Sequence, residues 1–261
     1  MKIKEFYEVL NTVAPKTLSD EYCTAYGAYD NSGLLINAGG EVTKALFTLD
    51  LTDKAIEQAK AEGADVIVTH HPVIYAPIKS VDGKIAKCIA AGINVVSMHL
   101  NLDGVNGGID ESLALAISRA CGGERVNGVQ ILHSLSQGGY GRAYEVLPTG
   151  AEAFVDALKK ELGTDKAWLF GERTKTISKV ASFCGSGVDD SAIAFAKASG
   201  ADVIISADWK HHQIINALEE GMLVVQLTHY ASEAYGFKKY YEKISQTVKV
   251  VCSYHEDKEL A

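Results

Sequence analysis

Residues 53–67 read DKAIEQAKAEGADVI, and residues 190–204 read DSAIAFAKASGADVI. Eleven of the fifteen positions are identical at a constant offset of 137 residues. The matching stretch covers a helix, its glycine turn and the strand that follows, which is typical of an internal duplication. The strands GINVVSM (92–98) and GMLVVQL (221–227) also correspond, at an offset of 129 residues. The chain therefore contains two copies of one α/β unit.

Short apolar runs alternate with helical stretches from residue 45 onward. Near-continuous apolar strands of this kind are typical of parallel strands buried on both faces. The pattern predicts an α/β fold of duplicated units, with mostly parallel sheets flanked by helices. We expect a first copy at residues 1–125 and, at residues 126–261, a connecting segment followed by the second copy. The strands expected in the first copy are Ala45–Leu49, Val66–Thr69 and Asn94–Met98, and the helices are Thr52–Glu62, Lys84–Ala91 and Ile109–Ala120.

The segment Val126–Lys175 separates the two copies and is predicted to be connective structure. It contains one expected strand, Gly141–Leu147, and one expected helix, Gly150–Leu162. Thr149 and Glu152 have the spacing of a capping box at the start of that helix.

Composition excludes several classes of protein. The net charge is −8 and the isoelectric point is about 5.5, which argues against nucleic acid as a partner. The five cysteines are scattered without C-x-x-C spacing, which argues against a disulfide framework and favours a reducing compartment. The N-terminal residues form an amphipathic helix that ends before Pro15 rather than a signal peptide, and no run is apolar enough to span a bilayer. We therefore expect a cytoplasmic protein without a membrane partner.

Histidines and carboxylates follow the ends of three predicted strands. In open α/β sheets, ligands bind outside the carboxyl ends of the strands. The runs are VTHHPVIY, SMHLNLDG and LTHYASE, which supply His70, His71, His99, Asp103, His229 and Glu233. A lone histidine at such a position is more often a hydrogen-bonded core residue, but the joint placement favours a metal centre. Because the ligands come from both copies, we expect the site in the crevice between them.

The number and type of these side chains favour two ions over one. A catalytic zinc uses about three protein ligands and a water. Five nitrogen and oxygen ligands instead suit two divalent ions about 3.5–4 Å apart, bridged by a carboxylate such as Glu233. Pro72 holds His71 extended, so that the rings of His70 and His71 can reach different ions. Zinc, iron and manganese all accept such ligands, and the sequence does not select among them.

Three further features have both a functional and a structural interpretation. Asp208, Lys210, His211 and His212 follow the expected strand Val203–Ser206 and form either part of a pocket or the polar first turn of a helix. The run CGSGVDD (184–190) is either an anion-binding loop or a tight turn, and the turn is favoured. The aromatic residues between Tyr235 and Ile244 are expected to pack against a sheet rather than to stack on a ligand.

The same motifs resemble the NIF-three-like family, whose members are named GTP cyclohydrolase I type 2 homologues. The resemblance rests on VTHHPV, SMHLNLD, ADVIISADWKHH and THYASE, and on YDNSGLLI (29–36), in which Tyr29 replaces the usual tryptophan. Ser206, Ala207 and Thr228 also depart from the usual pattern, although none is a presumed ligand. The 50-residue connection corresponds to the short form of the family, without an inserted middle domain.

The resemblance implies a ring-shaped homohexamer and a dinuclear metal centre. Its ligands fall on His70, His71, Asp103, His229 and Glu233, with His99 close by. These expectations lead to a metal-dependent hydrolase that acts on a small molecule, by resemblance GTP, with His99 as general acid or base. The alternative is a non-catalytic hexameric protein, acting as a metal-binding scaffold, a metallochaperone or a protein-interaction hub.

Overall fold

The computed structural model describes residues 1–260 and divides them into two compact units. Unit 1 consists of residues 1–105 and 237–256, and unit 2 consists of residues 106–236 and the C-terminal residues from 257 on. The boundary predicted at residue 125 separates the two copies of the sequence repeat, whereas the two units are defined by packing. The boundary therefore stays a prediction. Each unit is an α/β structure built on one sheet, which confirms the predicted fold class.

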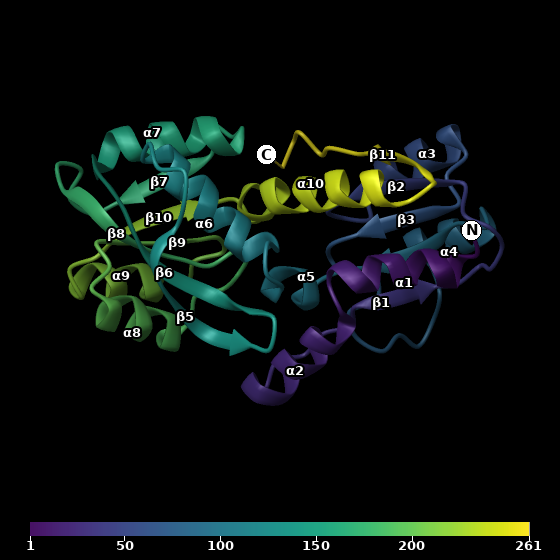
Figure 1. The fold of residues 1–261 in the computed structure, drawn as a ribbon, viewed down its shortest axis with the longest axis horizontal. Coiled ribbons are helices and arrows are strands. Elements are labelled where there is room, and N and C mark those ends of the chain that lie inside the picture. The colour runs from purple at the N-terminus through teal and green to yellow at the C-terminus, as the bar shows by residue number, and fades with distance from the viewer. Residues whose placement is uncertain (261) are drawn as a thin grey trace. The chain divides into compact units, whose positions relative to one another are not determined.

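Unit 1 contains a five-stranded sheet in the order β1-β4-β3-β2-β11. The strands from β4 to β11 pair in parallel, and β1 pairs antiparallel with β4. Figure 1 shows β11 returning from the C-terminal end of the chain to lie beside β2. The elements are α1 (Ile3–Val13), α2 (Lys16–Tyr26), β1 (Gly33–Ile36), β2 (Lys44–Thr48), α3 (Asp53–Glu62), β3 (Val66–Thr69), α4 (Gly83–Ala90), β4 (Asn94–Ser97), α5 (Leu100–Gly104), the later part of α10 (His229–Thr247) and β11 (Val251–Tyr254).

The central strands β3 and β4 of unit 1 are buried at every position because both faces of the sheet are covered. Leu46 and Ile67 point to one face, where they form a core with α3 and α4. Phe47, the next residue of β2, points to the other face and contacts the rings of Phe237 and Tyr240 on α10. The aromatic residues of the last helix therefore pack against the sheet, as expected.

Unit 2 contains a six-stranded sheet in the order β5-β6-β8-β9-β10-β7. The central strands β8, β9 and β10 are parallel, and the strands outside them pair antiparallel. The elements are α6 (Ile109–Ala120), β5 (Asn127–Leu135), β6 (Gly138–Gly150), α7 (Ala151–Leu162), β7 (Ala167–Phe170), β8 (Thr176–Ser182), α8 (Asp190–Ser199), β9 (Val203–Ser206), α9 (His211–Glu219), β10 (Leu223–Leu227) and the first turns of α10.

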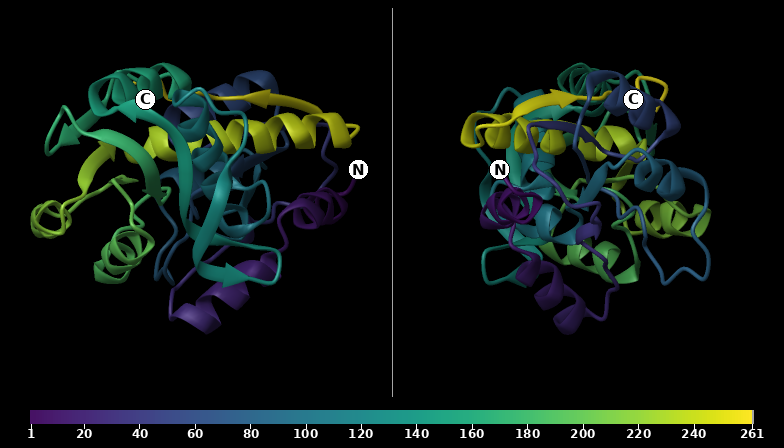
Figure 2. Two further views of the ribbon diagram at one scale, coloured as in Figure 1. Left: turned by 60° about the vertical axis from the view of Figure 1, so that its left-hand side comes forward. Right: turned by 90° about the vertical axis from the view of Figure 1, so that its right-hand side faces the viewer.

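The segment that was predicted to be connective is part of this sheet. β5 and β6 form a long hairpin, drawn in teal in both views of Figure 2, and β6 continues the sheet by pairing with β8. The predicted capping box is also wrong. α7 begins after Gly150 without a side-chain cap, because the Thr149 hydroxyl donates to the Leu147 carbonyl and Glu152 pairs with Arg173.

The duplication predicted from the sequence extends to the details of the fold. α3 and α8 begin and end at equivalent residues, with a side-chain cap from Thr52 in one and from Asp189 in the other. Before the following strand, Asp65 accepts the N–H groups of Thr43 and Lys44, and Asp202 accepts those of Ser178 and Lys179. The repeated Gly-Ala-Asp therefore supplies the helix end and the contact that joins two neighbouring strands.

The helices of residues 1–260 include none with both the length and the apolar character needed to cross a lipid bilayer.

Candidate metal centre

The first group of candidate ligands lies where β2, β3 and β4 end in unit 1. His70 and His71 follow β3 directly, and both of their N–H groups donate to the carbonyl of Leu49, at 3.1 Å each. This shared acceptor turns the chain at the end of β3 and places both rings on the same edge of the sheet. The ring centroids of His70 and His71 lie 4.8 Å apart, and those of His70 and His99 lie 5.1 Å apart.

His70 is completely buried, and its hydrogen bond determines which ring nitrogen can bind a metal. Its Nδ1 lies 2.7 Å from the carbonyl oxygen of Met98, which can only accept a hydrogen bond. Nδ1 therefore carries the hydrogen of the neutral ring, and Nε2 carries the lone pair. This Nε2 lies 3.6 Å from Oδ1 of Asp103, which is 5% exposed on the short helix α5.

His71 and His99 each have a carboxylate at Nδ1. Asp50 lies 2.8 Å from Nδ1 of His71, and Asp30 lies 2.8 Å from Nδ1 of His99. A carboxylate in this position orients an imidazole and makes its Nε2 a better metal ligand. One ligand atom from each of His70, His71 and His99 lies within 4.8 Å of the others, so these three side chains form a group that can hold an ion.

Asp30 is the most strongly held carboxylate of this group. Its Oδ2 accepts the hydroxyls of Ser19 at 2.5 Å and Ser32 at 2.6 Å, while Oδ1 faces His99. Burial alone would raise the pKa of Asp30, but hydrogen bonding from His99, its charge when protonated and the serine hydroxyls outweigh burial and lower the pKa well below its usual range. Asp30 is therefore an ionised acceptor at neutral pH.

The second group of candidate ligands lies in unit 2, at the end of β10. α10 begins at His229, so His229 and Glu233 lie one turn apart on the same face. Nε2 of His229 lies 3.0 Å from Oε1 of Glu233, whose side chain is buried. The carboxylate of Asp208 lies 2.5 Å from Nδ1 of His229, which repeats the arrangement of His71 and Asp50.

The backbone around this second group is adapted to it. Asp208 has a φ of 51°, the only positive φ among the described residues other than glycine, and this conformation follows directly after β9. Gly185 has a φ of 57°, and a Cβ there would overlap the carboxylate of Glu233 and lie 3.2 Å from Nε2 of His229. The CGSGVDD loop is therefore a tight turn that leaves room for these two side chains, and Asp189 caps the helix after it.

Each unit thus brings together its own candidate residues: the expected ligands His70, His71 and Asp103 with His99 beside them in unit 1, and the expected ligands His229 and Glu233 in unit 2. Sequence reasoning did not assign Asp30 or Asp50 and left the role of Asp208 open. Asp30 stands in the quoted YDNSGLLI run, and Asp50 follows an expected strand, which are the signals that could have found them. His211 and His212 lie exposed on the first turn of α9.

Comparison with known proteins agrees with this architecture. A "GTP cyclohydrolase 1 type 2 homolog" from Methanocaldococcus jannaschii is 32% identical over 254 residues, covering 95% of this chain and 96% of that protein. The solved structure "Reduced HcgD from Methanocaldococcus jannaschii" has a TM-score of 0.78 at 29% identity and covers 97% of both chains. A Bacillus cereus protein related to NIF3 shares the fold, with a TM-score of 0.83 at 18% identity over 98% of this chain and 97% of that chain. A family model described as Duf34/NIF3 (NGG1p interacting factor 3) matches residues 1–258, and the chain therefore belongs to the Duf34/NIF3 family.

Proposed function

We propose that this protein binds two divalent metal ions per chain and is a metal-dependent hydrolase that acts on a small molecule. The proposed ligands are His70, His71, Asp103, His229 and Glu233, with Glu233 as the bridge. The observation that carries the proposal is common to all four histidines of the two groups. Each has its Nδ1 at an acceptor, namely Met98, Asp50, Asp30 or Asp208, and this leaves Nε2 as the ligand nitrogen.

The distances within each group fit ligation. Two atoms that are each about 2.1 Å from one ion, at a tetrahedral angle, lie about 3.4 Å apart. The His70–Asp103 pair is separated by 3.6 Å and the His229–Glu233 pair by 3.0 Å. Imidazole nitrogens and carboxylate oxygens together suit zinc, iron or manganese rather than calcium, which prefers oxygen alone.

The proposal requires both groups to serve one pair of ions. α10 carries His229 and Glu233 in unit 2 and then continues into unit 1. Phe237 lies one turn after Glu233, and its ring centroid lies 6.2 Å from that of His70. Residues four apart on a helix share a face, so Glu233 and Phe237 lie on the same side of α10.

A pair of divalent ions held by these residues would lower the pKa of a water and so supply a nucleophile at neutral pH. We assign the proton transfers to His99. Asp30 holds Nδ1 of His99 and keeps the ring in one orientation, so that Nε2 can take or give a proton. Tyr75 lies edge-on to the same ring, with centroids 6.5 Å apart.

A cavity beside His71 favours an enzyme over a closed metal store. It has a volume of about 400 Å³ and lies within unit 1. His71 and Asp50 form one wall, Pro72 and Val73 continue it, and Lys84 and Ile85 belong to α4. A space of this size accepts a small molecule. The names of the relatives make GTP the first substrate to test, and the lysine offers a partner for an anionic group.

Cellular location and assembly belong to the same proposal. All five cysteines are free, which suits the reducing cytoplasm. The resemblance to the family favours a homohexamer, and closed symmetric assemblies are usual for soluble homo-oligomers.

Elemental analysis of metal-loaded variants tests the metal centre. Glu233→Gln keeps the size of the side chain and removes the charge that bridges two cations, so we expect it to lose at least one ion per chain without loss of circular dichroism. Glu242→Gln, an exposed position on the same helix, is the matched control and should retain two ions. If Glu233→Gln retains both ions and full activity, the assignment is wrong.

Activity separates the hydrolase from the non-catalytic alternative. A screen of metal-loaded protein against GTP and other small hydrolysable molecules should find turnover that His99→Gln removes while both ions remain bound. A protein that keeps two ions and hydrolyses nothing in such a screen would instead favour a scaffold or metallochaperone.

A further inference from the structure

We propose that the outer edge of β7 is a self-association surface, on which β7 of a second copy of this chain pairs antiparallel about a two-fold axis. The inference rests on the self-assembly proposed above and adds the surface that carries it. Within residues 1–260, β7 is the last strand of its sheet and pairs with β10 alone. A strand in this position directs about half of its backbone N–H and C=O groups away from the sheet.

The sequence of β7 leaves this edge without the usual protection. The strand reads AWLF and contains no charged residue and no proline, and the side chain of Trp168 is 46% exposed. The opposite edge of the same sheet differs, because β5 changes register against β6 between Asn127 and Gln130. Proteins use such irregularities, charges or prolines to prevent strand addition at an edge. An apolar, regular edge such as β7 is instead suited to receive another strand.

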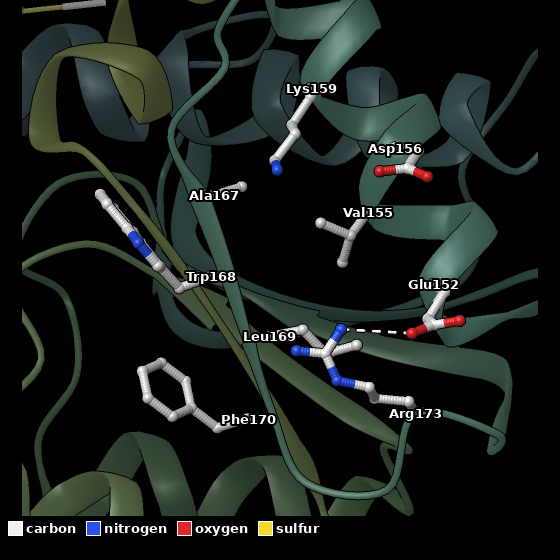
Figure 3. A pocket seen from close by; sticks show the side chains of 9 residues that line it. All are labelled: Glu152, Val155, Asp156, Lys159, Ala167, Trp168, Leu169, Phe170 and Arg173. Carbon is white, nitrogen blue, oxygen red and sulfur yellow. Dashed lines mark hydrogen bonds and ion pairs between the residues drawn. The ribbon is translucent and has the colours of Figure 1, made fainter.

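A groove lies beside β7 and is bordered by α7. Its volume is about 450 Å³, and all four residues of β7 line it. In Figure 3, Trp168 and Phe170 lie on the side of the strand away from α7, and α7 provides the opposite wall with Val155 and charged side chains. All four residues of β7 line the groove, so it runs along the whole length of the strand. The outer edge of β7 is the place where an added strand lies.

The apolar side chains of β7 are suited to pair with their own copies. When the two-fold axis passes beside Leu169, Trp168 of one copy lies opposite Phe170 of the other, and this pair is made twice. Directly opposed aromatic residues on one face of an antiparallel pair stabilise it. The exposed surface of Trp168 would be covered on both copies at once.

The charges beside the groove are also self-complementary. Glu152 pairs with Arg173, with 3.2 Å between Oε1 and the guanidinium, near the end of β7. Lys159 lies at the opposite end of α7, close to the start of β7. A two-fold axis brings the start of one strand to the end of the other, so Lys159 faces Glu152 of the second copy and Asp156 faces Arg173. An isologous interface requires this kind of complementarity.

Sedimentation velocity over a dilution series tests the surface in the full chain. Trp168→Arg should raise the dissociation constant of the two-fold contact by about tenfold or more, so that the mass of the assembly halves at concentrations where the wild type is intact. Val129→Arg is the matched control, because Val129 is 44% exposed on β5 of the same sheet. It should leave the mass unchanged, and circular dichroism should show that both variants are folded.

A second pair of variants and a backbone measurement complete the test. Lys159→Glu should weaken association by about threefold, whereas Lys160→Glu, the same change at the next position of α7, should not. Amide hydrogen exchange at residues 167–170 should slow as protein concentration rises. A wild type that stays at the 28.0 kDa of one chain overturns both self-assembly and this surface. An assembly that folded Trp168→Arg leaves intact, or that Val129→Arg disrupts equally, overturns this surface alone.

Discussion

The four histidines of the candidate centre share one arrangement, although they come from different segments. In each, a hydrogen-bond acceptor at Nδ1 leaves Nε2 as the ring nitrogen with the free lone pair. Three of the acceptors are carboxylates, which also supply charge. The arrangement is repeated across the duplication: Asp50 orients His71 in unit 1, and Asp208 orients His229 in unit 2. If the proposed metal centre is correct, these hydrogen-bond partners should contribute to metal affinity, and substitution of each one tests this.

Asp208→Asn should lower metal affinity by about 10–100-fold, because the amide can still accept from Nδ1 but no longer carries charge. Asparagine tolerates the left-handed backbone that Asp208 adopts, so the turn after β9 should persist. Competition with a chromogenic chelator measures the affinity. Asp190→Asn, an exposed change on α8, serves as the control, and equal affinities for the two variants would exclude this role for Asp208.

Asp30 should make the stability of the metal-free protein depend on pH. Its pKa in the folded state lies below the value of about 3.9 for an unfolded aspartate, so its contribution is complete above about pH 4 and is lost as the pH falls through the folded pKa. Asp30→Asn should cost about 2 kcal/mol at pH 7. Urea unfolding at several pH values should show the wild type and the variant converging below pH 4. A difference that stays constant down to pH 2 would contradict this account.

At the scale of single elements, the repeat controls where helices begin and end. α3 and α8 have side-chain caps at equivalent positions, Thr52 and Asp189, each of which accepts the N–H of the residue three positions later. The glycine that ends each helix adopts a left-handed conformation, with a φ of 69° at Gly63 and 76° at Gly200. These local signals lie within a few residues of the ends that they determine.

Thr52→Ala and Asp189→Ala should each destabilise the protein by about 1 kcal/mol, because each removes the acceptor for one N–H in the first turn of a helix. Chemical unfolding measures both, and the conservative Thr52→Ser, which keeps the acceptor, should cost much less. If the alanine variants unfold at the wild-type midpoint, the caps contribute no net stability.

The sequence predicted those elements whose determinants are local. The strands β3, β9 and β10 and the helix α6 begin and end where the apolar runs and glycines indicated. The expected strand Gly141–Leu147 lies within β6, but β5 was missed, because its first four residues are all exposed and its place in the sheet depends on pairing with β6. Thr149 does not cap α7 because it belongs to β6, which continues to Gly150. Its hydroxyl donates to the carbonyl of Leu147 instead.

The sequence identified the candidate site histidines, but it did not identify the carboxylates that hydrogen-bond to them. His70, His71 and His229 follow apolar strands, and that placement is visible in one sequence. The carboxylates that orient the histidines are not local: Asp30 lies 69 residues from His99, and Asp50 lies 21 residues from His71. Only the register of the sheet brings them together, and periodicity does not specify which strands are neighbours.

At the scale of the whole molecule, metal binding should stabilise the fold. Ions that bind the native state at 100 times their dissociation constant contribute about 2.7 kcal/mol each, and about 1 kcal/mol shifts the melting temperature of a chain of this size by about 2–4 °C. Removal of metal with a chelator should therefore lower the melting temperature by about 5–10 °C for each ion lost. Calorimetry on the wild type and on His71→Ala measures this, and a variant that still responds fully to the chelator would contradict the role of His71.

The division of α10 between the units has a consequence for the order in which the protein folds on the ribosome. Unit 1 begins at the N-terminus, yet its sheet lacks β11 and one face lacks Phe237 and Tyr240 until residues 237–256 have been synthesised. Most of unit 2 is made before that point. The half of the molecule that is translated first thus receives its last strand only after nearly all of unit 2 has been made, and Phe47 on β2 gains its aromatic neighbours only when the nascent chain is nearly finished.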